Sequence, residues 1–77
     1  MDNNFMLAAL LPFISGDDVS YYADLEVEKL TLLVSLAPFA KSSDNLMKIS
    51  KLNINNLQKL TGLLPQFDAD KIEEYFK

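Results

Sequence analysis

The chain of 77 residues has a formal net charge of −4 and is 49% hydrophobic, but it contains no histidine, cysteine, tryptophan or arginine. These absences exclude a disulfide framework, a thiolate nucleophile and a metal site built from His or Cys. They also remove histidine, the side chain most often used for acid/base catalysis near neutral pH. We therefore expect a protein that is not an enzyme and that binds no cofactor and no metal.

The length predicts a single domain over residues 1–77, because the chain is too short for two separate cores. A domain of this size buries only about 60% of the surface of its unfolded chain, so association with other copies is a plausible source of stability. An acid stands near the start of the chain, where a secretory signal carries basic residues. The apolar runs 5–14 and 30–40 are well short of the roughly 20 residues that span a bilayer. We therefore expect no membrane partner and a cytoplasmic location.

A first helix is predicted from Phe5 onward, with Asn3 or Asn4 as its N-terminal cap. Residues 5–11 are apolar on every side of this helix, a pattern typical of a helix surrounded by protein. A chain of 77 residues has few other segments that could pack around every side of such a helix. We therefore expect a second copy or another protein to cover it.

The second predicted helix is the longest and covers approximately residues 18–37. It follows a break at Ser15, which stands at capping-box spacing from Asp18. Apolar residues then advance in steps of three and four, which predicts one continuous stripe. The stripe consists of Val19, Ala23, Val27, Leu30, Val34 and Ala37.

Three shorter helices are predicted after residue 42. Ser43 is the expected cap of a third helix, Asn53–Asn56 is read as a turn and restart before a fourth, and Asp68 is the expected cap of the last. The side chains expected to face inward are Leu46, Met47, Ile49, Ile54, Leu57, Leu60, Leu64, Ile72 and Phe76. The predicted fold class is all-α, a compact bundle of four to five helices.

A proline followed by phenylalanine recurs at spacings of 26 and 27 residues, in segments 11–13, 37–39 and 64–67. One interpretation is a three-unit helical repeat that presents a surface. The other is that prolines end helices and aromatic residues fill the corners that follow. Under both interpretations Phe13, Phe39 and Phe67 are predicted to be buried or half-buried.

Charge is divided along the chain, because residues 1–28 contain six acids and no lysine, whereas residues 29–63 contain five lysines and one acid. Charge blocks of this kind form ion pairs within one fold, form ion pairs between copies, or lie on helix faces that are exposed to water. Acids also stand close together at 17–18, 68–70 and 73–74, but helix capping or solvation accounts for each pair. We therefore predict no catalytic residue. Seven lysines without arginine, together with six asparagines, hint at an AT-rich bacterial or phage genome.

The predicted function is a small protein-protein interaction or regulatory domain that self-associates through an apolar helix face. The candidate interface residues are Leu7, Leu10, Leu11, Phe13 and Tyr22. The alternative is a nucleic-acid-binding regulator with a helix-turn-helix-like segment at residues 44–61, near Lys41, Lys48, Lys51 and Lys59. The negative net charge and the absence of arginine oppose this alternative, so we expect the partner to be a second copy or another protein.

Overall fold

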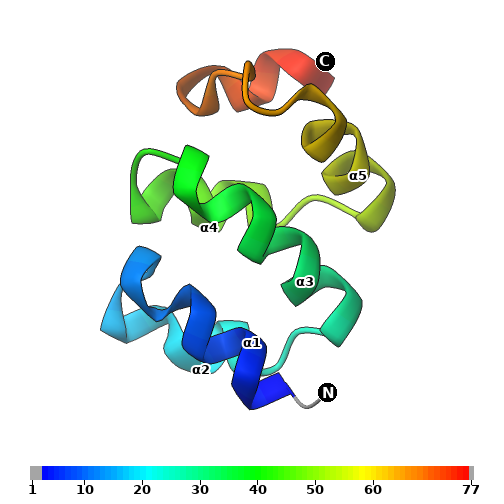
Figure 1. The fold of residues 1–77 in the computed structure, drawn as a ribbon. Coiled ribbons are helices and arrows are strands. Elements are labelled where there is room, and N and C mark those ends of the chain that lie inside the picture. The colour runs from blue at the N-terminus through cyan, green and yellow to red at the C-terminus, as the bar shows by residue number, and fades with distance from the viewer. Residues whose placement is uncertain (1–2, 77) are drawn as a thin grey trace.

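The computed structural model describes residues 3–76, which form three helical hairpins stacked on one another (Figure 1). The α-helices are α1 (Asn3–Leu10), α2 (Val19–Ala23), α3 (Val27–Leu36), α4 (Ser43–Ser50) and α5 (Ile54–Leu63). The 3-10 helices are η1 (Leu11–Phe13), η2 (Gly16–Asp18), η3 (Ala37–Phe39) and η4 (Ala69–Phe76). The all-α prediction is confirmed, although the number of helical elements exceeds the expected four to five when the 3-10 helices are included.

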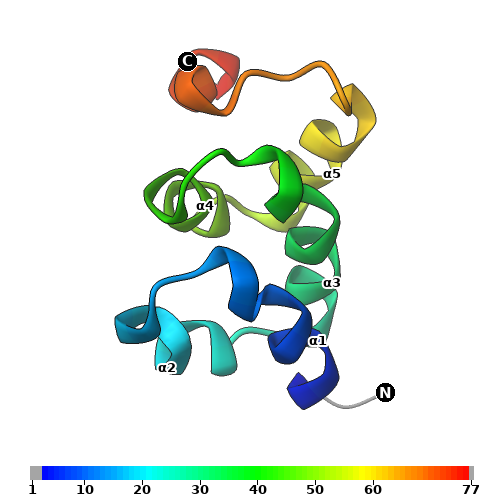
Figure 2. The same ribbon diagram turned by 60° about the vertical axis from the view of Figure 1, so that its left-hand side comes forward.

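Each hairpin contributes one helix to each of two layers. The first hairpin runs from α1 to α2, the second from α3 to α4, and the third from α5 to η4. In one layer α3 packs between α1 and α5, while in the other α4 packs against η4. Figure 2 shows the two layers side by side, with α1, α3 and α5 on the right and α2, α4 and η4 on the left.

The predicted long helix over residues 18–37 is wrong, because the chain breaks between α2 and α3. Asp24 ends α2, and Glu26 adopts an extended backbone with φ −65° and ψ 149°. The break allows α1 to pack against both α2 and α3. Apolar spacing alone did not reveal it, because apolar residues continue at helical intervals on both sides of the break.

The core lies between the layers and is formed mainly by leucine. Most residues predicted to face inward are confirmed there, including Leu46 and Ile49 of α4 and Leu57 and Leu60 of α5, which are fully buried. A leucine side chain buried to this extent stabilises the fold by about 1.5–3 kcal/mol. The other fully buried apolar side chains are Leu10, Tyr22, Leu30, Leu33 and Leu36.

Each hairpin begins its second helical segment with a capping side chain. Ser15 Oγ accepts a hydrogen bond from the Asp17 N–H at 3.3 Å, and Ser42 Oγ accepts one from the Asn45 N–H at 3.1 Å. In the third hairpin, Asp68 Oδ1 accepts one from the Asp70 N–H at 3.0 Å. These caps stand 27 and 26 residues apart, so the turns repeat together with the helices. The cap of α4 is thus Ser42 and not the predicted Ser43, and the arrangement favours the interpretation as a three-unit repeat.

The three phenylalanines of the turns differ in burial. Phe67 exposes 6% of its surface and confirms the prediction, whereas Phe13 and Phe39 expose 37% and 38%, more than expected. The third turn has one more residue between proline and phenylalanine than the first two. Phe67 therefore takes the inward position that Ala40, 2% exposed, holds in the second hairpin.

Candidate functional site

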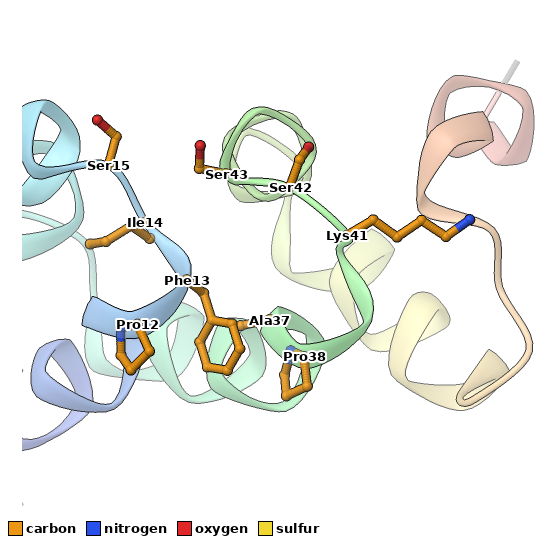
Figure 3. Close-up of a pocket in the computed structure, with 9 residues that line it drawn as sticks. All are labelled: Pro12, Phe13, Ile14, Ser15, Ala37, Pro38, Lys41, Ser42 and Ser43. Atoms are coloured by element: carbon orange, nitrogen blue, oxygen red, sulfur yellow. The ribbon is translucent and has the colours of Figure 1, made fainter.

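A hollow of about 340 Å³ lies between the turns of the first and second hairpins (Figure 3). Its apolar lining comes from the two proline-containing turns, where the Phe13 ring lies between Pro12 and Pro38. Its polar lining comes from serines at the starts of the following helices. The complete lining is Pro12, Phe13, Ile14, Ser15, Ala37, Pro38, Lys41, Ser42 and Ser43.

The polar groups around this hollow are already engaged. Lys41 extends away from it in Figure 3, and its Nζ lies 3.1 Å from Asp68 Oδ1 and 3.3 Å from Asp70 Oδ2. The hydrogen bonds to these carboxylates raise the pKa of Lys41. The Ser15 and Ser42 hydroxyls cap helices, and no ionisable residue other than Lys41 is found among the described residues that line the hollow. The one ionisable side chain among the described residues that line the hollow is therefore already paired with acids of the third hairpin.

The five residues predicted to form an interface fall into two groups. Leu10 and Tyr22 are fully buried, and Leu7 is half-buried against the core, so these three hold the first hairpin together. Leu11 and Phe13 expose 49% and 37% of their surface. Within the predicted set, the exposed apolar surface therefore lies at the end of α1 and in the turn that follows it. The expected cover for α1 comes largely from α2 and α3 of the same chain.

The exposure of Leu11 reflects its place at one end of the stack. Leu11 and Ala37 hold the same position in successive hairpins, since each follows the first helix and precedes a proline. Ala37 lies beside Pro12 and Phe13 of the preceding hairpin and exposes only 3% of its surface (Figure 3). No described hairpin precedes Leu11, which leaves its side chain open.

A second exposed apolar surface lies at the opposite end of the stack. Leu63 and Tyr75 expose 44% and 40% of their surface. They border a hollow of about 430 Å³ together with Lys59, Gly62 and Phe76. The sequence prediction did not include this surface, although the repeat spacing indicates it. Leu63 is the third member of a series with Leu10 and Leu36, which are both fully buried.

Tyr21 and Tyr22 play structural roles inside the stack. Their rings meet edge to face with centroids 5.2 Å apart. Burial raises the pKa of Tyr22 to about 12. The half-buried Tyr21 hydroxyl accepts a hydrogen bond from Ser50 Oγ at 3.0 Å, which joins the first hairpin to α4 of the second. Tyr22, one of the predicted interface residues, thus lies in the contact between the first two hairpins.

Acids of the third hairpin lie close to two of the lysines on which the nucleic-acid alternative depends. Lys48 Nζ lies 4.0 Å from Glu73 Oε1, and Lys41 is paired with Asp68 and Asp70. These contacts reduce the positive charge that residues 41–61 present. Among the described residues, no three His, Cys, Asp or Glu side chains are grouped so that they could hold a metal ion.

No protein-family model, curated protein or solved structure matches this chain. Within residues 3–76, no helix has the length and apolar character needed to cross a membrane. The two exposed apolar surfaces of the hairpin stack, at Leu11 and at Leu63, are therefore the features that bear on its function.

Proposed function

We propose that the protein is a small non-catalytic interaction domain that self-associates through apolar surface at the ends of its hairpin stack. The observation that carries this proposal is the 49% exposure of Leu11, at a position where the next hairpin has an alanine that is only 3% exposed. Leucine is thus exposed at both ends of the stack that residues 3–76 form, at Leu11 and at Leu63.

Burial of these side chains in an interface would contribute favourable free energy, because apolar surface removed from water stabilises by about 25 cal/mol per Å². Leu11 supplies aliphatic contact of the kind found at the apolar centre of interfaces. Phe13 is also exposed, and its ring lies between Pro12 and Pro38 in the adjoining turns (Figure 3). The hollow beside Phe13 offers room for a side chain of the partner. We therefore place Leu11 at the centre of the proposed interface and Phe13 at its margin.

The proposal is tested by molar mass in solution, measured by light scattering over a wide range of protein concentration. We expect the mass of the wild-type protein to rise with concentration, and the Leu11→Asp variant to remain a monomer with an unchanged helical circular dichroism spectrum. Asp at position 11 should be tolerated in the fold because the side chain is exposed.

Val27→Asp provides the matched control. Val27 is 38% exposed but begins α3, where an acid interacts favourably with the helix dipole. This variant should assemble as the wild type does. A wild-type protein that stays monomeric at every concentration, or a Leu11→Asp variant that assembles normally, would contradict the proposed function.

A further inference from the structure

We propose that copies of this chain associate head to tail, so that the exposed face of the third hairpin of one copy receives the exposed face of the first hairpin of the next. The Leu63 face consists of Leu63, Tyr75 and Phe76, and the Leu11 face is the exposed side of Leu11 at the end of the first hairpin. This inference rests on the proposed self-association and specifies which surfaces meet.

The chain already contains this contact between successive hairpins twice. The helix α3 packs against α1 of the preceding hairpin and against α5 of the following one. Leu10 and Leu36 are fully buried in hairpins that are followed by another, whereas Leu63 in the last hairpin is 44% exposed. The third hairpin thus presents the same leucine that the first two bury.

The opposite side of each hairpin shows a matching difference in burial. Ala37 is buried where the second hairpin meets the first, and Leu64 at the same position of the third hairpin is half-buried. Leu11 is their counterpart and has no described hairpin before it. The Leu63 face and the Leu11 face therefore correspond to two surfaces that already fit each other inside the chain.

The Leu63 face also has space for a larger side chain than alanine. The hollow beside Leu63 measures about 430 Å³. A side-chain Cβ added at Gly62 would meet no atom within 4 Å, so the helix surface next to Leu63 is open. Leu11 of a second copy would occupy this space, whereas inside the chain η3 presents the smaller Ala37 to the first hairpin.

Charge favours contact between unlike faces over contact between like faces. Lys59 borders the hollow of the Leu63 face, so two Leu63 faces in contact would bring two lysines together. The segment 1–28 contains six acids and no lysine, so two first hairpins in contact would bring like charges together. In the unlike arrangement Lys59 of one copy meets this acidic segment, while the third hairpin also carries Asp68, Asp70, Glu73 and Glu74, so the charge preference is modest and arises at Lys59.

A head-to-tail contact has a consequence for assembly size. Because it uses two different surfaces, every added copy leaves one Leu11 face and one Leu63 face available. The assembly therefore grows beyond a dimer unless its rotation closes a ring. A symmetric contact between identical faces would stop at two copies.

A mixing experiment with two variants tests this arrangement. Leu63→Asp removes the Leu63 face and keeps the Leu11 face, whereas Leu11→Asp removes the Leu11 face and keeps the Leu63 face. Both positions are exposed, so both variants should fold. Each variant alone should be a monomer by light scattering. An equimolar mixture should give a species of twice the monomer mass, because the intact Leu63 face of one variant joins the intact Leu11 face of the other.

The possible outcomes separate this inference from the proposed function. A wild-type protein that assembles while the mixture remains monomeric would overturn the head-to-tail arrangement and leave self-association standing. A wild-type protein that never exceeds the monomer would overturn both. If circular dichroism shows that Leu63→Asp is unfolded, Gly62→Glu replaces it, because a side chain at position 62 points into open space and blocks the same face.

Discussion

The middle hairpin and the end hairpins place the same helix positions in different environments. In the middle hairpin Leu36 is fully buried and Ala37 is 3% exposed. Their counterparts at the ends of the stack, Leu63 and Leu11, are 44% and 49% exposed. Burial at these positions therefore depends on the presence of a neighbouring hairpin and not on residue type, because Leu36 and Leu63 are both leucine.

Truncation of equivalent leucines should give the largest difference between the middle and the end of the stack. In the monomer, Leu36→Ala should reduce the free energy of unfolding by about 2–5 kcal/mol, because it leaves a cavity in the core. Leu63→Ala should cost no more than about 1 kcal/mol, since the side chain is already partly in water. Urea unfolding at low protein concentration measures both values. Equal losses would show that Leu63 is covered within the monomer.

The junctions between hairpins also differ, because the second and third are joined by polar contacts around Lys41. This residue has a φ of 76°, a left-handed conformation that disfavours side chains with a Cβ. Lys41→Gly and Lys41→Ala both remove the contacts with Asp68 and Asp70, but only glycine relieves the backbone conformation. We expect Lys41→Gly to melt roughly 4–8 °C higher than Lys41→Ala. Identical melting temperatures would indicate that the turn relaxes in both variants.

The smallest expected effect is a pH dependence of the same junction. Hydrogen bonds from Lys41 and from the Asn45 amide hold the pKa values of Asp68 and Asp70, respectively, below the ordinary 3.8. Their contribution to stability is therefore present above this ordinary pKa, and it is lost as the pH falls through the lowered values. The effect is small because these groups are exposed.

Thermal unfolding as a function of pH checks this expectation. The melting temperature of the wild type should fall on acidification, and Asp70→Asn, which lacks one of the two titrating carboxylates, should fall less steeply. Glu74→Gln is the control, because Glu74 lies on the same hairpin and is exposed but forms no ion pair with Lys41, so this variant should keep the acid dependence of the Lys41 junction. If Asp70→Asn and the wild type showed the same slope, the Asp70 contact would not contribute to stability.

The sequence predicted most of the burial within α4 and α5, although Ser42 and not Ser43 caps α4, and α5 begins at Ile54 inside the predicted turn Asn53–Asn56. The apolar positions of α4 and α5 predicted that Leu46, Ile49, Leu57 and Leu60 are buried, and all four are. The spacing of the proline-containing turns predicted a possible three-unit repeat, and the caps at Ser15, Ser42 and Asp68 recur with it. Propensity, capping and periodicity act over a few residues, which is why sequence alone determined the all-α class.

The helix break at residues 24–26 and the exposure of individual apolar residues depend on tertiary contacts, and the sequence pattern did not predict them. The predicted stripe across residues 18–37 continues through the break at residues 24–26, yet Ala23 and Val27 on either side of the break are exposed. Within the predicted interface, Leu10 became core and Leu11 remained surface, although both are leucines and adjacent in the chain. Burial at these positions depends on contacts between hairpins about 26 residues apart, and hydrophobicity at one position does not contain that information.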